Sequence, residues 1–175
     1  MLMWIVAVIV VAVLAVLGIA AARPNSFRIT RQATIRAPAE KVFALINDFH
    51  EWTKWSPWKK MDPALNRNYS GAAAGKGAIY GWNGNKKVGE GRMEIVDTQP
   101  PSRIDIKLDL VKPFEAHNST VVTFTPRDGG TLVEWAMSGQ SPFMFKLMGL
   151  FTNMDQMIGK DFEAGLANMK KDVEA

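Results

Sequence analysis

Five side chains of this 175-residue sequence are candidates for proton transfer: Asp48, His50, Tyr80, Glu115 and His117. A general acid or base needs only one perturbed group in apolar surroundings. His117 is the strongest candidate, followed by Glu115, because both stand at the start of an expected strand. The simpler interpretation of each residue is a surface position or a structural hydrogen bond. The sequence therefore identifies no catalytic residue beyond these weak candidates, and whether the protein is an enzyme stays open.

The residues that other kinds of catalytic site require are absent from the sequence or wrongly spaced. The sequence has no cysteine and no G-x-S-x-G turn, so a nucleophile of either type is missing. Its two histidines do not have the spacing of zinc ligands. The stretch GAAAGKG at residues 71–77 is one residue too short for a phosphate-binding loop and precedes an expected strand. We interpret it as a turn and predict neither a metal nor a cofactor.

Large apolar side chains recur at alternate positions of the expected strands and at helical spacing near the C-terminus. They predict the wall of an apolar cavity, which for a small molecule measures about 300 Å³ or more. The alternative is that the same residues fill a solid core. The residues expected to contact a hydrophobic ligand are Trp55, Trp58, Tyr80, Trp82, Met93, Ile106, Leu108, Phe114, Phe124, Trp135, Met137, Phe151, Met154 and Ile158.

The stretch EWTKWSPW at residues 51–58 places three tryptophans at a spacing of three. We expect Trp55 and Trp58 to close the mouth of the cavity, with Trp52 packed in the core. The alternative is that all three are core residues under a loop. A stacking platform for nucleic-acid bases would need a basic groove beside it. The charges are instead mixed in sign, despite a net charge of +4, so we expect no nucleic-acid partner.

These residues need a framework, and the alternation of apolar and polar residues predicts one. A strand at residues 27–35 precedes a helix that begins at Pro38. Six further strands follow at residues 68–71, 78–82, 88–96, 103–110, 119–126 and 131–138, with turns around Gly84 and at residues 127–130. From Pro142 the spacing is helical to the end, with an inward stripe that includes Leu147, Phe151 and Ile158. The expected fold class is α+β: a curved antiparallel sheet of about seven strands on a long C-terminal helix.

Residues 1–22 carry no charged side chain, and as a helix they span roughly 30 Å, the thickness of a bilayer core. We expect an uncleaved transmembrane anchor, then a linker at residues 23–26 and one domain at residues 27–175. The alternative is a cleaved signal ending at the alanines 20–22, although no basic residue precedes Arg23. Arginines behind the span place the domain in the cytoplasm by the positive-inside rule. A periplasmic or secreted domain is the alternative.

The order of these elements, with the stretches IRAPAEKVFALINDF, WSPW, GKGAIYGWNGN, KPFEAHN and MIGKDFEAGLANMKK, resembles the SRPBCC superfamily. Within it, the chain is similar to the polyketide cyclase/dehydrase and lipid-transport proteins. The resemblance covers residues 27–174 and implies the helix-grip fold, in which a curved sheet closes over a long helix and encloses a cavity. It does not imply a reaction, because one fold hosts many functions.

Two functions remain open from the sequence. The first, which we favour, is a membrane-anchored protein that binds a hydrophobic small molecule or lipid. The second is an enzyme of the polyketide cyclase/dehydrase type that uses proton transfer in the same cavity. The identity of the ligand, the oligomeric state and any protein partner cannot be read from the sequence.

Overall fold

The computed structural model describes every residue of the chain except Asp128. Seven strands form one antiparallel sheet in the order β1-β7-β6-β5-β4-β3-β2, with helices before, between and after them. The elements are α1 (Leu2–Ala22), β1 (Ser26–Ile35), α2 (Ala39–Asn47), α3 (Trp52–Trp55), α4 (Trp58–Met61), β2 (Asn66–Gly71), β3 (Ala78–Asn83), β4 (Glu90–Gln99), β5 (Arg103–Lys112), β6 (Ala116–Arg127), β7 (Gly130–Gln140), α5 (Phe143–Met148) and α6 (Met154–Glu174).

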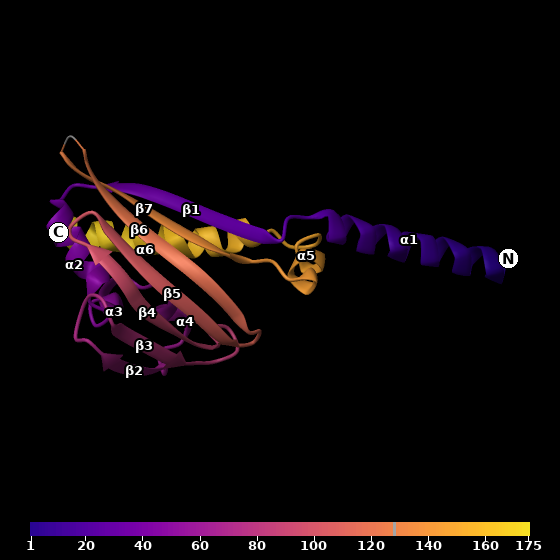
Figure 1. Cartoon of the computed structure of the whole chain (residues 1–175), viewed down its shortest axis with the longest axis horizontal. Coiled ribbons are helices and arrows are strands. Elements are labelled where there is room, and N and C mark those ends of the chain that lie inside the picture. Colours follow the sequence, from indigo (N-terminus) through magenta and orange to yellow (C-terminus); the bar gives the residue numbers. More distant parts are fainter. Residues whose placement is uncertain (128) are drawn as a thin grey trace.

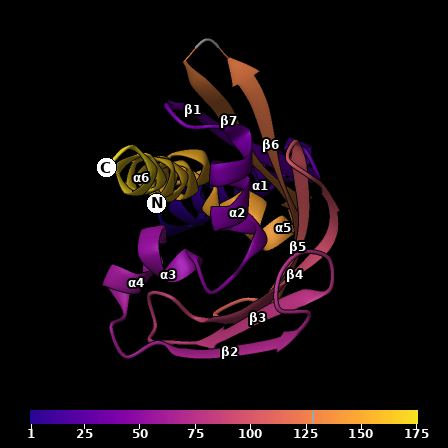
Figure 2. The same cartoon turned by 90° about the vertical axis from the view of Figure 1, so that its left-hand side faces the viewer.

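The sheet curves around α6, as Figures 1 and 2 show, and the expected α+β helix-grip fold is confirmed. Arg31 of β1 ties the helix to the sheet: its guanidinium lies 2.8 Å from an oxygen of Asp155 and 2.7 Å from one of Glu163. This side chain crosses the helix at Gly159, where a Cβ atom would stand 2.0 Å from the Arg31 Nη2 atom. The glycine therefore lets α6 lie directly against β1.

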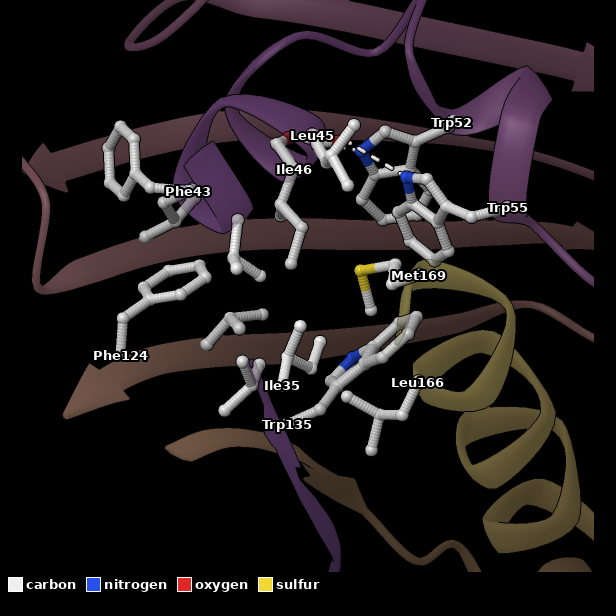
Figure 3. Packing of buried hydrophobic residues seen from close by; sticks show 14 of the residues in the cluster. Ile35, Phe43, Leu45, Ile46, Trp52, Trp55, Phe124, Trp135, Leu166 and Met169 are labelled. Atoms are coloured by element: carbon white, nitrogen blue, oxygen red, sulfur yellow. Dashed lines mark hydrogen bonds between the residues drawn. The ribbon is translucent and has the colours of Figure 1, made fainter. Parts of the chain in front are cut away.

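The hydrophobic core lies between the sheet, α2, α3 and the C-terminal half of α6 (Figure 3). Alternate strand residues face this core because side chains of a strand point to opposite sides of a sheet. The largest fully buried side chains are Trp55, Phe49, Ile35, Ile46, Ile95, Ile104, Ile106, Leu166, Met169, Val42, Val122 and Val133.

The helical stretch after Pro142 is not one helix, as the sequence predicts, but two. Helix α5 ends at Met148 and α6 begins at Met154. Asn153 caps α6, because its side-chain oxygen accepts a hydrogen bond from the Gln156 backbone N–H at 3.1 Å. The break removes Phe151 from the expected inward stripe and leaves it 77% exposed.

Both predicted hairpins are present in the sheet. Asn83 pairs with Glu90, so the connection at residues 84–89 is longer than the tight turn that the sequence suggests around Gly84. Arg127 pairs with Gly130 in the second hairpin, and Asp128, which belongs to the turn expected from the sequence, lies outside the described residues.

Helix α1 projects from the domain at the end where α5 lies (Figure 1). It is long and apolar enough to span a membrane, a property that signal sequences share. Its last turn is not free: Ala20 is fully buried, and α1 contacts α5. Just after the helix, Arg23 Nη1 donates a hydrogen bond to the Gly149 carbonyl at 2.7 Å.

Candidate functional site

A cavity of about 250 Å³ lies between the concave face of the sheet, α3, α4 and the N-terminal half of α6. Its volume is slightly below the 300 Å³ expected from the sequence, and its wall is mostly apolar. Nine of the predicted contact residues lie in this wall: Trp58, Tyr80, Trp82, Met93, Leu108, Trp135, Met137, Met154 and Ile158. Most of them were predicted correctly because the alternation along a strand indicates which side chains point to the inner face of the sheet.

The other five predicted residues lie elsewhere, and their expected place in the wall is corrected. Phe124 packs against Phe43 of α2, with ring centroids 5.4 Å apart, and Ile106 is fully buried in the same core. Helix α2 covers this end of the sheet, so inward residues there meet a helix. Trp55 is also a core residue. Phe114 and Phe151 are exposed.

Many residues of the wall were not predicted from the sequence. Arg67 and Tyr69 of β2 face inward together, and the period of that strand could have indicated both. Phe145 of α5 also lies in the wall, and it was missed because the sequence predicts one continuous helix after Pro142. The missed residues are Phe27, Phe49, Trp52, Thr53, Ser56, Lys59, Leu65, Arg67, Tyr69, Val88, Leu110, Ala116, Asn118, Thr120, Gln140, Phe145, Asp161 and Phe162.

The three tryptophans of EWTKWSPW gather around Trp135 of β7. The indole N–H groups of Trp52 and Trp55 donate to the carbonyls of Ile46 and Leu45, each at 3.0 Å, as Figure 3 shows. Both rings are buried, but Trp52 also lines the cavity. Trp58 is half-buried and lies in the wall. Trp52 is therefore a core residue as expected and also reaches the cavity, whereas Trp55 is a core residue and not part of the wall. Trp58 lies where the sequence predicts.

We expect Trp55→Ala to lower the free energy of unfolding by about 3 to 5 kcal/mol. The substitution empties a packed core site and leaves the Leu45 carbonyl without its hydrogen bond. Trp58→Ala should destabilise much less and should speed the dissociation of a bound fluorescent fatty acid. Urea unfolding and stopped-flow release measure the two effects. Equal stability losses in both variants, with unchanged release rates, would show that Trp58 is only packing.

A few polar groups interrupt the apolar wall. Asp161 of α6 has a raised pKa because of burial, which outweighs the opposing effect of a hydrogen bond with Trp58. Burial likewise raises the pKa of Tyr80. Arg67 donates one long hydrogen bond, of 3.4 Å, to the Leu65 carbonyl. No carboxylate of the described residues lies within 4 Å of its guanidinium.

The sequence model of the polyketide cyclase/dehydrase and lipid transport family matches residues 26–174, from the first residue of β1 to the last of α6. The chain belongs to this family. The resemblance drawn from the sequence is thereby confirmed. Among curated proteins, no sequence matches the chain.

Solved structures of the same fold accompany this family assignment. The di-domain ARO/CYC protein BexL of the BE-7585A biosynthetic pathway matches with a TM-score of 0.66 at 15% identity, covering 90% of this chain and 53% of BexL. The Aha1 dimer from Colwellia psychrerythraea matches at 0.60 and 14%, covering 85% and 96% of the two chains. Ara h 8.0201 matches at 0.60 and 11%, covering 85% and 97%. At these identities the similarity shows the fold alone.

Four of the five candidate proton-transfer residues of this polyketide cyclase/dehydrase family member lie outside the cavity wall. His117 Nδ1 is 2.7 Å from Asp109 Oδ1, its Nε2 is 3.4 Å from Glu115 Oε1, and both candidate side chains are exposed. His50 and Asp48 form a similar exposed pair at 2.7 Å. Only Tyr80 lies in the wall. The surface interpretation of His117 and Glu115 is supported by this geometry.

The hydrogen bond to Asp109 raises the pKa of His117. The pair should therefore stabilise the fold fully below the unfolded pKa of about 6.5, and this contribution should vanish as the pH rises through the higher folded value. We expect Asp109→Asn to lower the His117 pKa in an NMR titration of the imidazole protons. A His117 pKa that does not respond to Asp109→Asn would contradict the pairing.

Ligand affinity should be unchanged in His117→Ala and Glu115→Gln, because both side chains lie outside the cavity wall.

Proposed function

We propose that the chain is a membrane-anchored binding protein that holds a hydrophobic small molecule or a lipid in its cavity. The observation that carries this proposal is the apolar wall itself, with aromatic and thioether side chains such as Trp82, Met93, Trp135, Met137 and Met154. Burial of an apolar ligand against such a wall contributes about 25 cal/mol per Å² removed from water. Methionine side chains can adapt to ligands of different shape.

The proposed anchor is α1, and the domain boundaries expected from the sequence stay part of this proposal. The helix carries no charge, and its length of 21 residues suits a bilayer core. Arg23 and Arg28 follow it closely, which favours a cytoplasmic domain by the positive-inside rule. A binding domain held at the membrane surface stands close to its source of lipid.

Native mass spectrometry of the full chain extracted from its own membrane tests the proposal. We expect one hydrophobic small molecule bound to each chain. A fluorescent fatty acid should also bind at one site per chain and should be displaced by that molecule. Extraction of an empty protein that also fails to bind the fluorescent fatty acid would contradict the binding function.

Asp161 favours a second candidate function, an enzyme of the polyketide cyclase/dehydrase type. A carboxyl group with a raised pKa in an apolar wall is suited to proton transfer. This alternative predicts that the protein cyclises an aromatic polyketide analogue and that Asp161→Asn removes the activity. His117→Ala serves as a control, because His117 lies on the surface. Turnover that depends on Asp161 would favour the enzyme over the carrier.

A further inference from the structure

Large hydrophobic side chains are exposed mainly at one end of the domain. Apart from α1, the exposed ones are Met61, Val96 and Met157 and a group of six that we call the α5 face: Val111, Phe114, Phe143, Met144, Met148 and Phe151. The α5 face includes Phe151, at 77% exposed, and Met144, at 60%. Apolar surface gathered in this way marks an interaction site, whereas single exposed apolar residues need no explanation.

The residues of the α5 face come from two parts of the sequence that lie next to each other in the structure. Phe143, Met144 and Met148 belong to α5, and Phe151 follows in the turn before α6. Val111 and Phe114 lie where β5 ends and the chain turns back into β6. Phe114 reaches α5 through Phe145, with ring centroids 5.8 Å apart. Figure 1 shows α5 at the end of the domain from which α1 projects.

The position of α1 identifies what covers this surface. Ala20 lies within the apolar stretch of α1, yet it is fully buried, at the end of the helix that contacts α5. The Arg23 side chain donates a hydrogen bond to the Gly149 carbonyl, in the turn that includes Phe151. If α1 spans the bilayer, α5 must therefore lie at the level where the apolar core meets the headgroups. Apolar side chains at that depth move out of water and into the boundary between headgroups and acyl chains.

We propose that the α5 face rests on the bilayer in which α1 is embedded, with Phe143, Met144 and Phe151 in the boundary between headgroups and acyl chains. This inference rests on the proposed anchoring function. It also defines which side of the cavity faces the membrane. Phe27, Phe145 and Met154 line both the cavity and a second, more open hollow beside Arg23 and Phe151. The docked face thus brings this side of the cavity next to lipid.

The absence of cysteine from the sequence allows single-site labelling of the full chain. We would introduce Phe143→Cys and Phe151→Cys on the α5 face, label each with the fluorophore NBD, and reconstitute the full chain in phosphatidylcholine vesicles. A nitroxide on the lipid acyl chain then reports contact by quenching. The matched control is Val96→Cys, an exposed apolar residue of β4 toward the end paired with the start of β5, away from Val111. Leu14→Cys in α1 reports the anchor itself.

We expect the labels at residues 143 and 151 to be quenched severalfold more strongly than the label at residue 96. Quenching at residue 14 together with weak, equal quenching at residues 96, 143 and 151 would overturn the docking and leave the anchor intact. Blue-shifted but unquenched labels on the α5 face would also overturn it, because protein would then cover the face. A label at residue 14 that escapes quenching would reject both the anchor and the docking.

Discussion

Removal of residues 1–23 should convert the protein from an integral membrane protein into a soluble one. The full chain should stay with the membrane pellet after carbonate extraction, because about 20 apolar residues in a helix span the bilayer core and resist removal. A chain that starts at Pro24 should appear entirely in the supernatant. It should keep the circular dichroism of the fold, since Ala20 is the only residue of α1 that the structure buries among those described.

A charged residue in the middle of α1 is the matched control for this deletion. Leu14→Arg should weaken insertion by about 3 kcal/mol while leaving the length of the chain unchanged. Leu14→Ile should leave the protein in the pellet. Native protein that begins at Arg23 and lies free in the periplasm would contradict the anchor and identify residues 1–22 as a cleaved signal.

Met137→Lys should abolish ligand binding. Met137 is 6% exposed, lies in the cavity wall and pairs across the sheet with Ile29 and Thr120. A lysine there would place its ammonium group in apolar surroundings, where an unpaired charge costs several kcal/mol, or would fill the cavity. We expect the affinity for a fluorescent fatty acid to fall by at least about a hundredfold, which corresponds to about 2.7 kcal/mol.

Two controls separate loss of the site from loss of the fold. Met137→Leu is apolar and of similar size, so it should bind within about tenfold of the wild type. Val96→Lys adds the same charge at an exposed position and should change neither binding nor stability. If Met137→Lys unfolds the domain, Leu108→Trp tests the same wall by filling the cavity. Normal binding by folded Met137→Lys and by Leu108→Trp would show that the ligand lies elsewhere.

The sequence by itself determined the order of the elements and the apolar helix at the N-terminus. Alternation of apolar and polar residues is a local property, and it identified all seven strands, with Tyr80, Trp82, Met93 and Leu108 on the face that forms the cavity wall. The composition of residues 1–22 likewise needs no tertiary context to predict a long apolar helix.

Only the tertiary structure decided what covers each apolar face. Ile106 and Leu108 lie on the same side of β5, yet one is fully buried in the core and the other lies in the cavity wall. Trp55 packs in the core, whereas Trp52 three residues earlier also reaches the cavity. Periodicity reports the direction in which a side chain points and carries no information about its partner, because the partner comes from a distant part of the chain.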